Sequence, residues 1–476
     1  MSQFTNLTIT KARELLDDGE VSAVELTSHY LKEIDSKNKE LNAFLSVHAE
    51  KALASAKGAD IKIKNDQASY LTGIPLAIKD NILVKDELCT AGSKILENYK
   101  ASYNATVIER LNRESAVILG KTNLDEFAMG SSTENSAYGV TKNPNDISRV
   151  PGGSSGGSAA VVAADLCLGA LGTDTGGSIR QPASFCGIVG LKPTYGAVSR
   201  FGAVALGSSL DQIGPMAKTV KDVAIIYETI SGHDPLDSTT VPNNSKLLDR
   251  VEEINIADLR IGIPKEYFEA KGLNSEVKEM VMKAVSWFES QGATIKEISL
   301  PHTEYALAAY YIIQPAECSA NLARYDGIRY GRRADAKDLL DTYLKSKGQF
   351  LGAETQRRIM IGTYALSSGY YDAYYSQAQK VRTLVKKDFM EAFEDVDVIF
   401  TPTSPSTAFK IGEKTADPLE MYAADIFTVT ANLAGVCGLS LNCGKINGLP
   451  VGLQILGPWF GENLLFKVGE FYEQLR

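Results

Sequence analysis

Two clusters of glycine and serine are the segments of this sequence best suited to chemistry. The first, from Pro151 to Ser158, reads PGGSSGGS, and the second, from Asp174 to Arg180, reads DTGGSIR. Either cluster alone could be only a turn. The pair is harder to explain in that way, because each glycine removes a side chain where backbone N–H groups can face a ligand.

Phosphate is one anion that such loops bind, but the sequence disfavours it. Gly120-Lys121-Thr122 resembles the end of a P-loop, yet Ser115 stands where that motif needs its first glycine. No lysine follows the first cluster, and no GxGxxG motif follows a predicted strand. The remaining candidate is an oxyanion that forms during attack on a carbonyl group.

An oxyanion site needs a nucleophile, a base, and donors placed where negative charge develops. Donors are available in the successive N–H groups of Thr175, Gly176, Gly177 and Ser178. The base is less obvious, since the four histidines are scattered along the chain. Lys79 can serve, because it interrupts an apolar strand and burial would favour its neutral amine. The alternative is that Lys79 is an ordinary surface lysine at the end of a strand.

The two clusters, at this spacing and with Lys79 upstream, resemble the amidase signature family. The resemblance covers essentially the whole chain. It implies an α/β fold, namely an α/β/α sandwich around a large mixed sheet with a mostly helical insertion. It also implies a catalytic triad, in which Ser178 would be the nucleophile, Ser154 would follow a cis peptide bond and relay the proton, and Lys79 would be the base.

Four further segments resemble one branch of that family, the A subunits of glutamyl-tRNA(Gln) amidotransferases. These segments are Asp326 to Gly331, Arg357 to Ile359, Thr363 to Tyr375 and Asn432 to Gly435. By this resemblance Arg358 would bind the α-carboxylate of glutamine and Asp425 its α-ammonium group, while Tyr310 would line the pocket. Gly130 and Ser131 would lie near the substrate amide. The charges fit, because a guanidinium fork suits a carboxylate.

Other interpretations of these residues stay open. Arg358 and Asp425 could be charges on helix surfaces. Cys437 and Asn442 depart from the branch, which usually has proline there, and this could loosen a strand near the pocket. The chain also stops soon after Gln474, short of the usual tail, which could affect partner contacts.

Hydrophobic periodicity and turn residues predict the elements that position these segments. A capping box at Ser22 begins a helix, and Asn447-Gly448 is typical of a hairpin turn. We predict a single domain, residues 1–476. Its parts are a helical N-terminal part (1–70), a catalytic core (71–232), a helical substrate-pocket and partner region (270–395) and a part that completes the sheet (396–476).

Composition excludes several classes of protein. The chain has 49 basic and 58 acidic residues, a net charge of −9, which argues against its binding tRNA alone. No histidine lies near another or near a cysteine, so no metal site is expected. The six cysteines show no CxxC and indicate a reducing compartment. The longest apolar stretch, Ala159 to Gly172, is too short to span a membrane, and we expect a soluble cytoplasmic protein.

The resemblance predicts a glutaminase that forms part of a carbon–nitrogen ligase. It would supply ammonia from glutamine for converting Glu-tRNA(Gln) to Gln-tRNA(Gln). No cofactor would be bound by this chain. A partner B subunit would bind tRNA and use ATP and Mg²⁺, and a small C subunit would complete a heterotrimer. Two alternatives are a stand-alone amidase acting on another small amide and a catalytically silent scaffold subunit.

Overall fold

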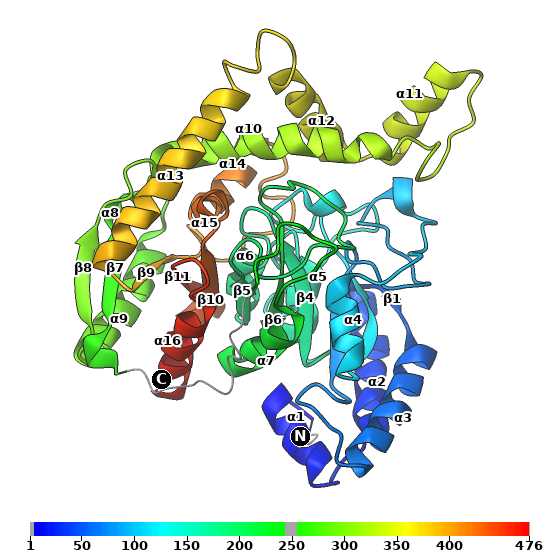
Figure 1. Cartoon of the computed structure of the whole chain (residues 1–476), viewed down its shortest axis with the longest axis vertical. Helices are drawn as coiled ribbons and strands as arrows, with labels where there is room; N and C mark the ends of the chain where they lie inside the picture. The colour runs from blue at the N-terminus through cyan, green and yellow to red at the C-terminus, as the bar shows by residue number, and fades with distance from the viewer. Residues whose placement is uncertain (1–3, 243–254, 476) are drawn as a thin grey trace.

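The computed structural model describes residues 4–242 and 255–475 (Figure 1). In this part of the chain eleven strands form one sheet, in the order β1-β3-β2-β4-β6-β5-β10-β11-β9-β7-β8. β2 runs parallel to β3 and β4, and β7 runs parallel to β8 and β9, whereas the other pairs are antiparallel. The predicted large mixed sheet is confirmed. The strands are β1 (Phe44–Val47), β2 (Pro75–Lys79), β3 (Val117–Thr122), β4 (Gly169–Asp174), β5 (Val189–Lys192), β6 (Gln212–Ala217), β7 (Arg260–Pro264), β8 (Thr294–Ile298), β9 (Val398–Pro402), β10 (Cys437–Ile446) and β11 (Leu449–Gly457).

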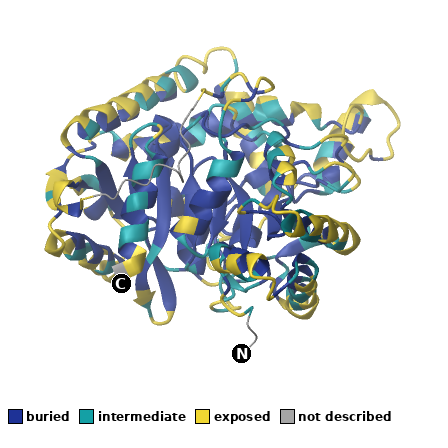
Figure 2. Cartoon of the chain, turned by 60° about the horizontal axis from the view of Figure 1, so that its bottom comes forward, coloured by how far each residue is buried: buried dark blue, intermediate teal, exposed yellow. Residues whose placement is uncertain are grey.

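Helices surround the sheet, whose strands form the buried centre of the molecule (Figures 1 and 2). None of the described helices combines the length and the apolar composition needed to cross a membrane. Their bounds are α1 (Ile9–Asp17), α2 (Ala23–Leu41), α3 (Ala49–Lys64), α4 (Thr106–Arg113), α5 (Gly156–Ala163), α6 (Arg180–Cys186), α7 (Val220–Ile230), α8 (Lys265–Phe268), α9 (Ser275–Ser290), α10 (Thr303–Asn321), α11 (Leu339–Phe350), α12 (Ala353–Ala365), α13 (Tyr375–Asp395), α14 (Pro418–Tyr422), α15 (Val429–Ala434) and α16 (Glu462–Leu475).

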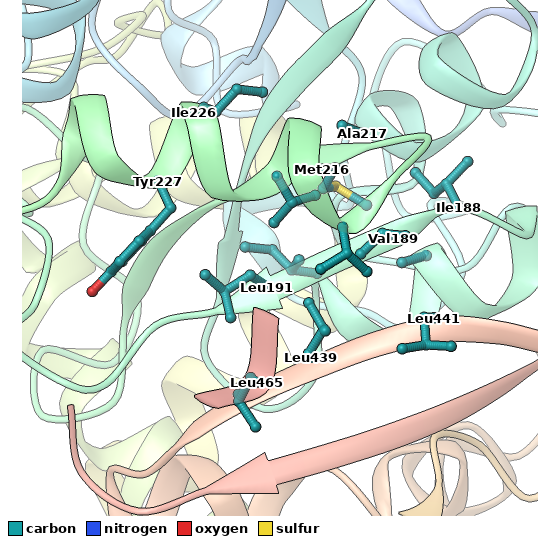
Figure 3. Packing of buried hydrophobic residues seen from close by; sticks show 14 of the residues in the cluster. Ile188, Val189, Leu191, Met216, Ala217, Ile226, Tyr227, Leu439, Leu441 and Leu465 are labelled. Atoms are coloured by element: carbon teal, nitrogen blue, oxygen red, sulfur yellow. The ribbon is translucent and has the colours of Figure 1, made fainter. Parts of the chain in front are cut away.

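The hydrophobic core extends across the sheet and into the helices that cover it. Figure 3 shows the part where β5, β6 and β10 meet α7 and α16. The labelled side chains are Ile188, Val189, Leu191, Met216, Ala217, Ile226, Tyr227, Leu439, Leu441 and Leu465. Each of them is buried, so residues far apart in the sequence share one apolar interior, which stabilises the fold through the hydrophobic effect.

Two local sequence signals are confirmed. Ser22 caps α2: its Oγ accepts the Glu25 N–H at 3.1 Å, while its own N–H donates to the Glu25 carboxylate at 2.9 Å. Asn447 and Gly448 connect β10 to β11 with φ of 51° and 83°. Both residues adopt positive φ, as a two-residue hairpin turn requires.

Two strands in the middle of the chain were not predicted. β7 and β8 add to one edge of the sheet, although β8 lies inside the segment predicted as mostly helical. β8 reads TIKEI, and a sequence this short with two apolar residues fits a strand and a helix equally well. Strands therefore also lie between the predicted catalytic core and the part predicted to complete the sheet.

The two residues that depart from the family branch both lie in β10. Cys437 is buried, and its Sγ donates to Pro458 O at 3.2 Å. The register of β10 against β11 shifts between Asn442 and Gly444, where Asn442 Oδ1 accepts the Gly444 N–H at 3.0 Å. The strand continues in register to Ile446 beyond this irregularity.

The sheet places one predicted catalytic residue at a defined edge. β2 and β4 are parallel neighbours, with Ile78 opposite Leu171. Lys79 therefore lies at the carboxyl end of β2, beside the end of β4 that leads into the DTGGSIR loop. In α/β sheets, ligands bind outside the carboxyl ends of parallel strands. The same edge is the place to look for a site here.

Candidate active site

Lys79 ends strand β2 and is completely buried. Its Nζ lies 2.7 Å from Ser154 Oγ, 2.8 Å from Ser155 Oγ and 2.9 Å from Thr173 Oγ1. Burial lowers the pKa of Lys79 to about 7, against the attraction of nearby carboxylates. The amine can therefore be neutral near physiological pH, which is the state that a general base needs.

Ser154 and Ser155 precede α5, and the Gly153–Ser154 peptide bond is cis. The turn is fixed from two sides. The Gly153 N–H donates to Gln181 Oε1 at 2.9 Å, and Ser155 Oγ donates to Thr173 O at 3.1 Å. A Cβ at Gly153 would lie only 2.2 Å from Asp125 Oδ2, so this close approach requires glycine.

Ser178, the predicted nucleophile, lies in the loop between β4 and α6 and is 9% exposed. The two serine segments meet through the backbone, since the Ser155 N–H donates to Ser178 O at 3.1 Å. Within residues 4–242 and 255–475, no hydrogen bond joins Ser178 Oγ to Ser154 Oγ. The structure therefore brings Lys79 and Ser154 into contact and places Ser178 beside them.

The DTGGSIR loop is held by a buried ion pair. Arg180 Nε and Nη2 donate to the two oxygens of Asp174, each at 3.0 Å, and Arg180 Nη1 donates to Gln454 Oε1 at 2.7 Å. Burial opposes ionisation of Asp174, but Arg180, helped by Lys192 and Asn432, holds the pKa of that carboxyl at about 2. A bidentate pair of this kind fixes the loop geometry.

The predicted oxyanion donors are corrected at one position. The Gly177 N–H donates to Asp174 Oδ1 at 2.8 Å, so the carboxylate that holds the loop has already taken this donor. No hydrogen bond within the described chain takes up the N–H groups of Thr175, Gly176 and Ser178. These three predicted donors can still face a ligand.

The segment with Gly130 and Ser131 lies between the predicted catalytic groups and Asp425. Ser131 Oγ lies 2.8 Å from each oxygen of the Asp425 carboxylate. Asp125 holds the segment by accepting the Thr133 N–H at 2.8 Å. Burial raises the pKa of Asp125 to about 6. Gly130 lines a cavity of about 170 Å³, whereas Ser131 is buried behind it.

Arg358 lies on α12 and is buried, not on the helix surface. Its Nε donates to Glu354 Oε1 at 2.8 Å and its Nη1 to Gln314 Oε1 at 2.7 Å. The guanidinium stands 5.0 Å from the Tyr311 ring centre and 5.1 Å from that of Tyr422. Nη2 makes no hydrogen bond with the described residues, and Arg358 lines the same cavity as Gly130. The cavity therefore has a cationic donor in its wall.

Asp425 is also buried and lies near Arg358 across a shared tyrosine. Tyr311 donates its hydroxyl to Asp425 Oδ2 at 3.0 Å, while its ring lies beside Arg358 and stacks on Tyr422 at 3.9 Å. Burial raises the pKa of Asp425 to about 6. The fold thus places one cation and one anion, far apart in the sequence, on either side of Tyr311.

Tyr310 connects this charged pair to the DTGGSIR loop. It is buried, and its ring lies edge-on to Tyr311, with centres 5.0 Å apart. A Cβ at Gly176 would lie 2.6 Å from Tyr310 Cζ, so the ring packs directly on the DTGGSIR loop. All the predicted site residues therefore belong to one contiguous region of the molecule.

Sequence reasoning missed several residues that build this region. They are Asp125, Ser155, Thr173, Tyr311, Gln314, Glu354 and Tyr422. One signal was available: Glu354 stands four residues before Arg358, the spacing of an ion pair on one helix face. Tyr311 and Tyr422 had no such signal, because only the tertiary fold brings them together.

Comparison with known proteins agrees with this geometry. A sequence model of the amidase family, described as Amidase, matches residues 25–466. The chain is 58% identical over 470 residues to the A subunit of glutamyl-tRNA(Gln) amidotransferase from Caldanaerobacter subterraneus subsp. tengcongensis, covering 98% of this chain and 96% of that protein.

Solved structures show the same similarity. The crystal structure of the A subunit of glutamyl-tRNA(Gln) amidotransferase from Thermotoga maritima aligns with a TM-score of 0.80 and 42% identity, covering 98% of this chain and 94% of that one. The native peptide amidase of Stenotrophomonas maltophilia aligns with a TM-score of 0.83 and 30% identity, covering 99% and 97%. Relatives with different named activities therefore share this architecture.

Proposed function

This chain belongs to the amidase family, and we propose that it is the glutaminase component of a glutamyl-tRNA(Gln) amidotransferase. The observation that carries the proposal is the pairing of two buried features. Lys79 contacts Ser154, and the neighbouring Ser155 holds the Ser178 backbone. Arg358, which lines the cavity, and Asp425 flank Tyr311. The first feature suits amide hydrolysis, and the second suits a free amino acid.

The contacts of Lys79 determine which hydroxyl group it can deprotonate. A neutral amine has two hydrogens and one lone pair. Ser155 Oγ and Thr173 Oγ1 can accept the two hydrogens, which leaves the lone pair for the Ser154 hydroxyl at 2.7 Å. Lys79 then takes the proton of Ser154 as Ser154 takes that of Ser178. A hydrogen bond between Ser154 and Ser178 would form with substrate, as catalytic hydrogen bonds often tighten only in the complex.

Ser178 Oγ attacks the side-chain amide carbon of glutamine. The carbonyl oxygen becomes negative and is stabilised by the N–H groups of Thr175, Gly176 and Ser178. Proton return through Ser154 lets the nitrogen leave as ammonia, and a glutamyl ester remains on Ser178. Water then hydrolyses the ester, so glutamine and water give glutamate and ammonia.

Recognition would use the charged pair. Arg358 Nη2 would bind the α-carboxylate of glutamine and Asp425 its α-ammonium group. An uncharged amide would gain neither contact, which disfavours it relative to glutamine. The competing function is that of a stand-alone amidase. The similarity to a peptide amidase favours this second candidate. Identity of 58% to the A subunit of an amidotransferase supports the glutaminase.

The remaining parts of the proposal concern partners and location. The relative's name implies further subunits, and we assign tRNA binding and the use of ATP and Mg²⁺ to a B subunit, with a small C subunit in a heterotrimer. A net charge of −9 supports tRNA being held mainly by a partner. The burial of all six cysteines as thiols supports a reducing cytoplasm.

The experiment is recovery of the native protein from its source with whatever copurifies, followed by assay of ammonia release from glutamine. We expect associated subunits, glutaminase activity, and loss of that activity in Ser178→Ala. A monomer that hydrolyses uncharged amides faster than glutamine would establish the stand-alone amidase instead.

A further inference from the structure

Gln314 is a buried polar residue with one unused donor. It lies on α10 with no exposed surface. Its Oε1 accepts Arg358 Nη1 at 2.7 Å, whereas its Nε2 has no hydrogen-bond partner among the described residues. The orientation of the amide is fixed, because a flipped amide would direct N–H groups at the guanidinium donors. A buried donor left unpaired is costly, so this one calls for a partner.

The neighbours of Gln314 place it at the proposed substrate pocket. Tyr310 and Tyr311 precede it by four and three residues on α10, so all three share one helix face. A Cβ at Gly207 would lie 3.7 Å from Gln314 Cγ and 3.2 Å from Thr175 Cγ2. Gln314 therefore stands between Arg358 on α12 and the loop that carries Thr175.

Two adjacent side chains each keep one donor that no described residue accepts. Arg358 uses Nε for Glu354 and Nη1 for Gln314, which leaves Nη2, and Gln314 keeps Nε2. A positively charged ligand group is disfavoured beside the guanidinium. A carboxylate has two oxygens that together accept several hydrogen bonds, so it matches two donors from hydrogen-bonded neighbours.

We propose that Gln314 Nε2 donates a second hydrogen bond to the α-carboxylate of bound glutamine, which makes Gln314 a specificity residue for substrates that carry this group. The inference depends on the proposed glutaminase function and goes beyond it by naming a second contact. Gln314 has a dual role, because its oxygen holds Arg358 in place while its nitrogen contacts the ligand.

The test compares glutamine with 4-aminobutanamide, which keeps the amide and the ammonium group but lacks the α-carboxylate. Gln314→Met keeps the length of the side chain and removes the donor. We expect KM for glutamine to rise about tenfold or more, as for a lost hydrogen bond to a charged group, with kcat within about threefold. The kinetic constants for 4-aminobutanamide should change less than about twofold. Ile313→Val, a buried neighbour outside the pocket contacts, serves as the packing control and should leave the substrate preference unchanged.

A second variant separates direct contact from positioning of Arg358. In an Arg358→Ala background, Gln314→Met should lower the remaining preference for glutamine further, by about fivefold or more. No further change would mean that Gln314 acts only through Arg358, and would overturn the proposal. Gln314→Ala, read with melting temperature, repeats the test if the methionine variant folds poorly. An equal loss of kcat/KM for glutamine and for 4-aminobutanamide in the Gln314 variants would also overturn the proposal for Gln314. The proposed glutaminase function would still stand. A wild-type complex without glutaminase activity would overturn the proposed function itself.

Discussion

Chemistry at the scale of single residues depends on how burial changes charge. Lys79 and Lys192 are both buried lysines, and burial lowers the pKa of Lys79 to about 7 and that of Lys192 to about 8. They differ in their contacts. Lys79 reaches three hydroxyl groups, whereas Lys192 Nζ donates to a backbone carbonyl, Pro193 O, at 2.9 Å. A depressed pKa alone therefore does not identify the base.

The pH dependence of the rate should report Lys79. Burial disfavours the charged amine, so the folded pKa falls and the neutral base appears at lower pH than in free lysine. We expect kcat/KM for glutamine to rise with pH through about 7. Lys79→Arg should lose the rate by several orders of magnitude, because arginine stays charged. Lys192→Met is the control and should keep the midpoint of this pH dependence. A shifted midpoint in Lys192→Met would show that the rate reports Lys192 rather than Lys79.

Substrate preference should depend on the charged pair. Removing Arg358 leaves a buried α-carboxylate unpaired, which costs about 2–5 kcal/mol. Arg358→Ala should therefore lower kcat/KM for glutamine by about thirty-fold to several thousand-fold, and that for butanamide far less. The same loss on both substrates would show that Arg358 holds the fold rather than the ligand.

The anionic member of the pair adds a pH signature. Burial raises the pKa of Asp425 to about 6, so the carboxylate gains a proton as pH falls through that value and loses its attraction for an ammonium group. KM for glutamine should rise below about pH 6, and Asp425→Asn should abolish that pH dependence while raising KM throughout. Glutaramate, which lacks the ammonium group, is the control substrate. If KM for glutamine does not change with pH in either the wild type or Asp425→Asn, Asp425 does not bind the ammonium group.

At the scale of elements, the sequence predicted what local patterns determine. The capping box at Ser22 and the hairpin turn at Asn447 depend on neighbours in the chain, and both are confirmed. The polar edge strand β8 was missed, because it has too few apolar residues to show a period. The contact between Tyr311 and Arg358 could not be predicted from the sequence either, because it depends on how two helices pack and not on either helix alone.

That packing has a specific cause. α10 and α12 cross where Gly362 meets Pro315, and a Cβ at Gly362 would lie 1.8 Å from Pro315 O. Arg358 stands one turn before Gly362 on the same face of α12, and it contacts Gln314, the residue before Pro315. The close approach of the two helices therefore fixes the position of the guanidinium.

Gly362→Ala should separate the two helices. We expect a lower melting temperature and a KM for glutamine at least about tenfold higher, with a smaller effect on 4-aminobutanamide. Gly58→Ala in α3 is the matched control, since nothing lies within 4 Å of its Cβ position. In an open helix position alanine should stabilise the protein by about 0.5–1 kcal/mol. Unchanged kinetics in Gly362→Ala would show that Arg358 does not depend on this contact.

At the scale of the whole molecule, the sheet and the helices α10 and α12 position different parts of the proposed site. Lys79 at the carboxyl end of β2 and Ser178 in the loop after β4 are the proposed acyl-transfer groups, while α12 carries Arg358, the proposed contact for the substrate carboxylate. The resemblance in the DTGGSIR and GGSSGGS segments could identify the first set, because those motifs are local. It could name Arg358 and Asp425 but not their partners, because 67 residues separate the two and only the fold joins them.

This division predicts that ammonia production and ammonia use can be separated in the assembled enzyme. Ser178→Ala removes the nucleophile and leaves the fold, because Ser178 Oγ makes no hydrogen bond within the described residues and its backbone contacts remain. Loss of a nucleophile should lower glutamine hydrolysis by several orders of magnitude. The partner would keep its own site, so ammonium chloride should restore formation of Gln-tRNA(Gln) from Glu-tRNA(Gln) with ATP.

The measurement is charged tRNA formed with glutamine or with ammonium chloride, in wild-type and Ser178→Ala complexes. Failure of both donors in a correctly assembled Ser178→Ala complex would mean that this chain contributes more than ammonia. Full activity with glutamine would instead show that Ser178 is not the nucleophile.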